Sequence, residues 1–321
     1  MKNFLELRAL IEDQIQDISY PQKPKNIYEP IKYILSLGGK RIRPALVLMS
    51  HQLFNTDIER SFKAAIAIEL FHNFTLLHDD IMDKSPLRRG KETVHKKWNN
   101  DIAILSGDMI LINAYELISE INSDKLPEIM QVFNKAARRI CEGQQLDLDF
   151  AKRSEITISE YLKMIEYKTS ILLASSLKIG AINGGGTNQD LNNIYKFGIN
   201  IGIGFQLQDD LLDIFGDSDS IGKKVGGDIE SNKKTYLYLR ALTDADEGKR
   251  DRLMQYFTYN RRDTKKIQDI KDIYIDLNIY DKTINLIKKY HQKAMSHLEL
   301  INSDNKLPLL DLCENLKCRD Y

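Results

Sequence analysis

The segment SFKAAIAIELFHNFTLLHDDIMD, residues 61–83, decides the fold class. Its apolar residues recur at helical spacing around nearly the whole circumference, which predicts a helix buried on most sides. The segment ends in three carboxylates, Asp79, Asp80 and Asp83. Asp79 and Asp83 are four residues apart, so they share one face of the helix. Two charges that close repel by ~4 kcal/mol at an effective dielectric constant of about 20, so the pair calls for a bound cation.

A second acidic segment, FQLQDDLLD at residues 205–213, repeats this pattern about 130 residues later. Asp209 and Asp213 again stand four residues apart, with Asp210 beside them and apolar residues on both sides. One such segment could be a helix cap or a solvated corner, but two copies with identical spacing favour a binding function. Clusters of carboxylate oxygens suit Mg²⁺, which commonly bridges carboxylates to substrate phosphates. The sequence therefore predicts two facing carboxylate walls that hold several Mg²⁺ ions around a diphosphate.

Helical periodicity extends over most of the remaining chain. It begins with Phe4, Leu7 and Ile11, and further helices are predicted at residues 101–121, 126–150, 158–183, 190–215, 234–242, 250–259 and 282–301. Alternating strand patterns are scarce, and no long linker interrupts the chain. These patterns predict an all-α protein, a single-domain bundle of ten or more helices over residues 1–321.

The composition limits the classes of function. Hydrophobic residues make up 42% of the 321, enough for a sizeable core. The 46 basic and 46 acidic residues balance, which argues against general binding to nucleic acid or to anionic membranes. Three cysteines provide no disulfide framework and fit a reducing cytosol. With no visible targeting segment or membrane span, we expect a soluble cytoplasmic protein.

Basic residues gather near the acidic segments in sequence. GGKRIRP at residues 38–44 predicts a turn followed by a helix start, where cations and free N–H groups could hold phosphate. The others are Arg88-Arg89-Gly90, Lys168-Thr169 within a predicted helix, Gly222-Lys223 and Asn232-Lys233. Each alone is ordinary surface charge. Together they exceed what one diphosphate needs, which predicts two anionic substrates.

These motifs, in this order, resemble those of the trans-isoprenyl diphosphate synthase (polyprenyl synthetase) family. DDIMD and DDLLD are the two aspartate-rich motifs, GGKRIRP precedes them, and the resemblance covers nearly the whole chain. It implies an all-α domain around a central cavity, of the isoprenoid synthase type. It also implies a short-chain geranylgeranyl or farnesyl diphosphate synthase that uses Mg²⁺, with about three ions per active site.

The resemblance also implies roles for individual residues. Direct Mg²⁺ ligands would be Asp79, Asp83 and Asp209, with Asp80, Asp210 and Asp213 in support; Lys168 joins these six as catalytic. The allylic diphosphate would be held by Arg88, Lys168, Lys223 and Lys233, with Thr169 and Gln206 lining its site. Isopentenyl diphosphate would bind Gly39, Lys40, Arg43, His72 and Arg89. Near the metals would lie Gln144 and Asp147, and Arg319 would help to close the site. His78, although next to Asp79, is interpreted as structural.

The implied reaction is ionisation, condensation and elimination. The C–O bond of a dimethylallyl, geranyl or farnesyl diphosphate ionises, the double bond of isopentenyl diphosphate attacks, and a proton is lost. Such a reaction needs a dry, preorganised site that stabilises the leaving diphosphate. It needs no Ser or Cys nucleophile.

Phe74 and Thr75 bear on product length. Phe74 precedes Asp79 by five residues, roughly 7–8 Å along a helix. In the family an aromatic residue there acts as a floor for the growing chain, although simple core packing would also explain it. Because Thr75 is small and the first motif lacks an insertion, we expect a C20 geranylgeranyl product rather than a C15 farnesyl product.

Three alternatives remain open at this point. A class I terpene cyclase would share an aspartate-rich motif but would not need Lys40, Arg43 and Arg89. A non-catalytic subunit of a heteromeric prenyl synthase would usually lose one aspartate motif, and both are intact. In a helical scaffold the acidic pairs would be incidental. The family further implies a homodimer, for which the apolar segment 101–121 is the candidate interface.

Overall fold

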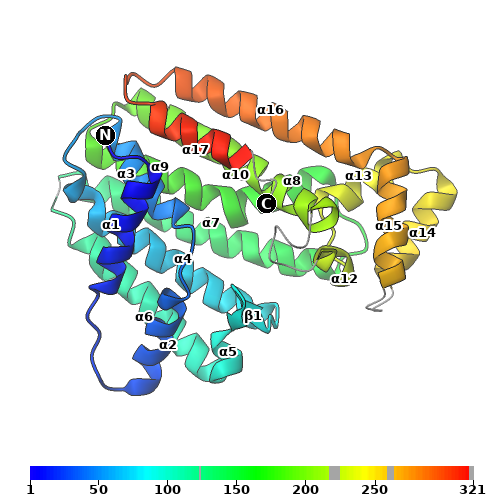
Figure 1. The fold of residues 1–321 in the computed structure, drawn as a ribbon, viewed down its shortest axis with the longest axis horizontal. Helices are drawn as coiled ribbons and strands as arrows, with labels where there is room; N and C mark the ends of the chain where they lie inside the picture. The colour runs from blue at the N-terminus through cyan, green and yellow to red at the C-terminus, as the bar shows by residue number, and fades with distance from the viewer. Residues whose placement is uncertain (123, 217–224, 259–263, 318–321) are drawn as a thin grey trace. The chain divides into compact units, whose positions relative to one another are not determined.

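The computed structural model describes residues 1–122, 124–216, 225–258 and 264–317, and these are almost entirely helical (Figure 1). The helices are α1 (Phe4–Gln16), α2 (Lys25–Ser36), α3 (Ile42–Gln52), α4 (Phe62–Met82), α5 (Val94–Lys97), α6 (Asn100–Ser119), α7 (Leu126–Lys152), α8 (Ile158–Ile165), α9 (Ile171–Gly184), α10 (Asn188–Phe215), α12 (Gly227–Glu230), α13 (Tyr236–Asp244), α14 (Glu247–Thr258), α15 (Thr264–Asp276), α16 (Ile279–Glu299) and α17 (Leu307–Lys317). A 3₁₀ turn (Ile58–Ser61), a π-helical turn (Glu166–Ser170) and a hairpin of β1 (Leu87–Arg88) and β2 (Lys91–Glu92) complete the elements. The all-α prediction is confirmed.

The chain divides into two compact units. One comprises Met1–Lys135, Ser175–Tyr195 and Ile301–Leu310, and the other Ala136–Ala174, Lys196–Leu300 and Asp311–Tyr321. Helices α7, α9, α10 and α17 contribute residues to both units. The two aspartate-rich motifs belong to different units, because α4 lies in the first and the second half of α10 lies in the other.

The core of the first unit is built on α4, which lies beside α6 and α3 (Figure 1). Every side chain from Ala64 to Phe71 is at most 5% exposed, so the helix is buried around its whole circumference, as its sequence predicts. Alanines at 64, 65 and 67 let neighbouring helices approach closely. Burial of this kind stabilises by about 25 cal/mol for each Å² of apolar surface removed from water. The carboxylates at the end of α4 therefore project from a rigid element.

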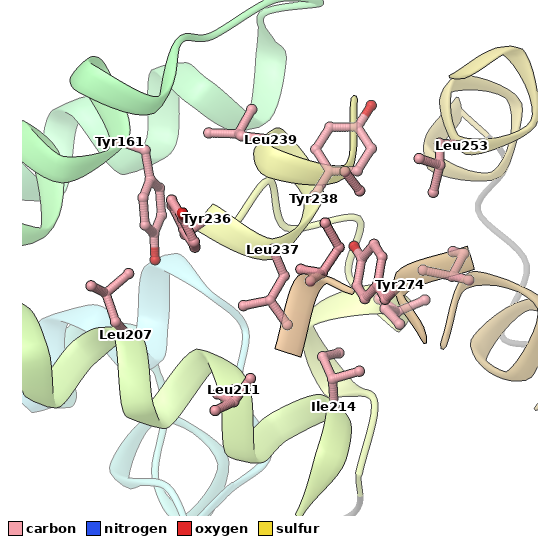
Figure 2. Close-up of a cluster of buried hydrophobic side chains, with 14 of the residues drawn as sticks. Tyr161, Leu207, Leu211, Ile214, Tyr236, Leu237, Tyr238, Leu239, Leu253 and Tyr274 are labelled. Carbon is pink, nitrogen blue, oxygen red and sulfur yellow. The ribbon is translucent and has the colours of Figure 1, made fainter. Parts of the chain in front are cut away.

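The core of the second unit is an aromatic and aliphatic cluster shown in Figure 2. Leu207, Leu211 and Ile214 come from one face of α10 and pack into it. At about 100° per residue, this face places Asp209 and Asp213 on the other side of α10 and leaves Asp210 at the edge of the cluster. Figure 2 shows Tyr161 of α8 with its hydroxyl directed toward α10. Apolar packing thus fixes which carboxylates of the second motif are buried.

Helix α6 combines length with an apolar composition. Within the described part of the chain it alone is long and apolar enough to cross a membrane by those two criteria, and 33% of that stretch is buried. The helix carries Asp101, Asp108 and Glu116 and packs along α4. Core helices satisfy the same two criteria, so the criteria do not identify a membrane span.

Candidate active site

The end of α4 joins an aspartate to an arginine through a two-point contact. Asp80 is buried, and Arg88 donates to both of its oxygens, from Nε at 2.8 Å to Oδ2 and from Nη2 at 2.6 Å to Oδ1. Burial raises the pKa of Asp80, although the Arg88 guanidinium opposes that rise. Asp79 lies farther from the guanidinium, 4.0 Å between Oδ2 and Nη2. Asp80 therefore fixes the position of the Arg88 guanidinium beside the first aspartate-rich motif.

A tight hairpin brings this arginine back to α4. Strands β1 and β2 are joined by Arg89 and Gly90, whose φ angles are 54° and 74°. Two consecutive residues of positive φ match the twist of short hairpins, and glycine accepts that conformation without strain. Thr93 pins the base of the hairpin, since its Oγ1 donates to the carbonyl of Ser85 at 2.8 Å. The hairpin, which the sequence patterns did not predict, is the device that positions the arginine pair.

Arg43 and His72 form a second basic pair in the same unit. Arg43 Nη1 lies 3.1 Å from His72 Nε2. Burial and the neighbouring guanidinium of Arg43 hold the pKa of His72 well below its usual range. Since a guanidinium can only donate, Nε2 accepts and the proton of the neutral ring is on Nδ1. Arg89 lies against Gly39, where a Cβ would approach its Nη2 to 2.9 Å, so glycine leaves room for the guanidinium.

Arg41, from the same GGKRIRP segment, has a different role. Its side chain is buried and forms ion pairs with Glu12 and Glu69, while Nη2 donates to the carbonyl of Leu35 at 3.0 Å. Arg41 adopts a left-handed conformation with φ 51°, directly before α3. A buried charge bonded on three sides is a structural anchor, and it fixes the start of the helix that carries Arg43.

The second motif lies within a chain of hydrogen bonds in the other unit. Thr169 Oγ1 donates to Gln206 Oε1 at 3.0 Å, and Gln206 Nε2 donates to Asp210 Oδ1 at 3.1 Å. The buried Tyr161 hydroxyl donates to the other oxygen of Asp210. Burial, together with the charge of Asp228, raises the pKa of Asp210 to about 7. Asp210 thus occupies the position in its motif that Asp80 has in the first, with both oxygens bound by protein donors.

Asp213 links the end of α10 to α12 through a hydrogen bond. The backbone N–H of Asp228 donates to Asp213 Oδ2 at 2.9 Å, at the start of α12. Burial and the Asp228 charge raise the pKa of Asp213 to about 6. Concentrated negative charge here favours the binding of cations.

Lys168 and Thr169 lie in the π-helical turn rather than in a regular helix as predicted. Such turns occur frequently at functional sites because the extra residue redirects the side chains. Gly143 of α7 permits a close approach, since a Cβ there would lie 2.5 Å from the Lys168 backbone nitrogen. Lys168 Nζ then reaches Asp147 Oδ2 at 2.6 Å. Burial would raise the pKa of Asp147, but Lys233 and Lys168 lower it.

The geometry agrees with three comparisons. A family model for polyprenyl synthetase matches residues 24–277. A short chain isoprenyl diphosphate synthase from Methanocaldococcus jannaschii is 37% identical over 321 residues, 100% of this chain and 96% of that protein. The chain belongs to the polyprenyl synthetase family. Polyprenyl synthetases are trans-prenyltransferases, and this chain is one of them.

Two solved structures extend the comparison. Geranylgeranyl pyrophosphate synthetase from Pyrococcus horikoshii Ot3 has a TM-score of 0.92 and 34% identity, covering 98% of each chain. Polyprenyl synthase from Caulobacter crescentus CB15, solved in complex with calcium and isoprenyl diphosphate, has a TM-score of 0.87 at 28% identity, covering 98% of this chain and 94% of that one. The fold is therefore that of the polyprenyl synthetases.

The structure groups the predicted site residues by unit. The first unit brings together Gly39, Arg43, His72, Asp79, Asp80, Arg88 and Arg89, with Lys40 exposed beside them and Asp83 capping α4. The second unit groups Asp147, Lys168, Thr169, Gln206, Asp210, Asp213 and Lys233, with Gln144 on α7 and Asp209 on α10. Lys223 and Arg319 lie outside the described residues. That both groups serve one polyprenyl synthetase site stays a prediction.

Sequence reasoning missed several members of this site. Tyr161 and Asp228 set the environment of Asp210, and Glu12 and Glu69 set that of Arg41. Asp228 could have been noticed as a carboxylate in the GGDIESNKK segment that holds Lys233. Tyr161 carries no such signal, because its helix reads simply as amphipathic.

The carboxylates suit the Mg²⁺ that membership of the family implies. All the candidate donors are oxygens, which Mg²⁺ prefers. Among the described residues, no three His, Cys, Asp or Glu side chains already converge as a metal cage. Mg²⁺ usually binds through one or two carboxylates plus water and substrate phosphate. The aspartates of the two motifs supply oxygens of this kind, and Arg88, Tyr161 and Gln206 fix the position of the middle ones.

Proposed function

We propose that this chain is a Mg²⁺-dependent synthase that condenses isopentenyl diphosphate with an allylic diphosphate and makes C20 geranylgeranyl diphosphate. The observation that carries the proposal is the shared construction of the two motifs. In each, protein donors bind both oxygens of the middle carboxylate, Asp80 or Asp210, and hold it at the end of a packed helix. The resemblance to the family then makes Asp79, Asp83 and Asp209 the proposed Mg²⁺ ligands. The Pyrococcus relative with 34% identity is itself a geranylgeranyl pyrophosphate synthetase.

Different basic residues of the chain would bind the two diphosphates. Arg88, Lys168 and Lys233, with Lys223, would hold the allylic diphosphate, and the Thr169–Gln206 pair would orient it. Arg43, Arg89 and Lys40 would bind isopentenyl diphosphate, with neutral His72 beside Arg43. Bound Mg²⁺ would supply positive charge to the departing diphosphate. Preorganised cations of this kind stabilise developing negative charge without rearranging during the reaction. The proton lost after condensation would leave with the diphosphate.

Product length is proposed to depend on Phe74. It is half-buried on α4, five residues before Asp79, which corresponds to about 7–8 Å along the helix. Thr75 is small, and its Oγ1 donates to the His72 carbonyl at 2.8 Å, so it leaves space directly below the aspartates. A floor at Phe74 rather than at Thr75 favours C20 over C15.

Two other functions are less well supported. A class I terpene cyclase needs one diphosphate site, whereas Arg43, His72 and Arg89 form a basic group in addition to Arg88. A non-catalytic subunit would not need to keep both buried aspartate contacts.

The test is prenyl transfer by the purified full chain. The protein is incubated with Mg²⁺, isopentenyl diphosphate and, separately, dimethylallyl, geranyl or farnesyl diphosphate, and the dephosphorylated products are sized. We expect a C20 alcohol, and loss of the product in Asp209→Asn but not in the exposed control Asp251→Asn. A C15 product would correct the length. No elongation with any primer by folded protein would favour the subunit or cyclase alternative.

A further inference from the structure

Phe74 does not lie directly under the first motif. At about 100° per residue, its position on α4 is about 140° around the helix from Asp79, whereas Thr75 is only about 40° away. A side chain so displaced can close a channel below the aspartates only if its ring is held in one direction. Neighbouring side chains must therefore decide whether Phe74 acts as a floor.

Two rings hold Phe74. The His78 ring, one turn further along α4, meets it edge-on with centroids 4.7 Å apart and planes at 64°. The Phe71 ring lies 5.7 Å away on the other side. Phe71 is buried and contacts Phe133, so it is fixed by the core. Edge-to-face ring pairs contribute about 0.5–1.5 kcal/mol beyond simple burial.

His78 is itself held by α6. Its Nε2 lies 3.2 Å from the carbonyl of Ile104, to which an N–H can donate, and 3.8 Å from Asp108 Oδ1. Gly107 makes this contact possible, because a Cβ at that position would lie 2.4 Å from His78 Nε2. The imidazole is therefore trapped between the backbone of α6 and the ring of Phe74.

We infer that His78 is a positioning residue for product length: its imidazole, anchored on α6 at Gly107 and Ile104, holds the Phe74 ring as the floor of the product channel. This inference rests on the proposed role of Phe74. It assigns His78 a function through Phe74 rather than on the diphosphates, even though Asp79 is the next residue. Gly107 becomes a specificity residue for the same reason.

The test compares product distributions of the full-length enzyme and its variants. In His78→Ala the ratio of products longer than C20 to C20 should rise by about three- to tenfold, the range that one lost ring contact supports. Phe74→Ala should lengthen the product further. The double variant should match Phe74→Ala alone, because His78 acts only through that ring.

Conservative variants separate the ring from the hydrogen bond. His78→Phe keeps an aromatic edge and should keep the wild-type product. His78→Asn keeps a donor for the Ile104 carbonyl but loses the ring, so it should lengthen the product. Lys63→Met removes the exposed ion pair from Lys63 to Glu120, at the other end of the α4–α6 contact, and should leave product length unchanged.

The outcomes separate a failure of the role inferred for His78 from a failure of the floor proposed at Phe74. If Phe74→Ala lengthens the product and His78→Ala and His78→Asn do not, the inference is wrong and the floor stands. Additive lengthening in the double variant would also overturn it. If Phe74→Ala leaves the product unchanged, the floor itself fails, and the inference fails with it.

Discussion

At the scale of single residues, the contact between Arg88 and Asp80 shows how the site is preorganised. Two guanidinium nitrogens bind the two oxygens of one buried carboxylate, a geometry that only arginine supplies. The Arg88 guanidinium therefore has a fixed position and orientation before any substrate binds. Two arginines of one motif, Arg41 and Arg43, have different surroundings: Arg41 is enclosed by the carboxylates of Glu12 and Glu69, and Arg43 contacts the neutral imidazole of His72.

Arg88→Lys tests this preorganisation while keeping the charge. A lysine cannot form the two-point contact, so kcat/KM for the allylic diphosphate should fall by about 10- to 100-fold, the equivalent of one charge-assisted hydrogen bond. The measurement is steady-state kinetics with the allylic substrate varied. Lys91→Arg, an exposed change in the same hairpin, is the control. Wild-type kinetics in Arg88→Lys would show that charge alone suffices.

Burial of the His51 imidazole leads us to expect that the free energy of unfolding depends on pH. The side chain is fully buried on α3, its Nδ1 lies 2.8 Å from Ser61 Oγ, and burial lowers its pKa to about 4. The nearby charges of Asp57 and Arg60 oppose one another. The unfolded chain takes up the proton near pH 6.5 and the folded chain only near pH 4, so stability is lost as pH falls between these values. The loss should be about 2 kcal/mol from pH 7.5 to 5.

Urea unfolding at the two pH values measures this loss. His51→Asn removes the titrating group, so the difference in unfolding free energy between pH 7.5 and 5 should be smaller in the variant by that amount. Acidic groups respond equally in both proteins and cancel in the comparison. An identical pH response in the two proteins would contradict the buried neutral state of His51.

At the scale of elements, the π-helical turn between α8 and α9 is the feature on which the second half of the site depends. It directs Lys168 toward Asp147 and Thr169 toward Gln206. The capping box of Thr157 and Glu160 fixes the start of α8 and hence the position of the turn. Periodicity in the sequence predicted one helix through this region, because a single extra residue in a turn hardly disturbs the apolar pattern.

Gly143→Ala should disturb this turn. The new Cβ would meet backbone atoms, 2.5 Å from the Lys168 nitrogen, and a backbone cannot move aside cheaply. We expect the KM for the allylic diphosphate to rise at least about tenfold, since misplacement by 1 Å can cost 10²-fold. Gly204→Ala is the matched control: its Cβ would meet nothing closer than 3.9 Å, and alanine is the better helix former by about 1 kcal/mol. Equal kinetics in both variants would count against a role for the turn.

At the scale of the whole molecule, helical periodicity sufficed to predict the fold class and most helix boundaries, because the apolar faces are long and regular. The two acidic segments identified the chemistry. What could not be predicted depends on distant partners: Arg41 with Glu12 and Glu69, and Tyr161 with Asp210. Such contacts join residues 28 to 49 positions apart, and no local pattern records them. The division into two compact units is likewise invisible in a sequence that has no linker.

The exposed face of α6 supports a last prediction, about assembly. Ile104, Leu105 and Ile112 are 43%, 56% and 51% exposed on a helix whose other face packs on α4. Large apolar side chains gathered on one face often mark an interface, and the family expectation of a homodimer gives that face an occupant. Leu105→Glu should therefore convert a dimer into a monomer, measured by light scattering during size-exclusion chromatography. Asp251→Asn, an exposed change on α14 and not on α6, should not alter the mass. Elution of the wild-type protein as a monomer at micromolar concentration would contradict this prediction.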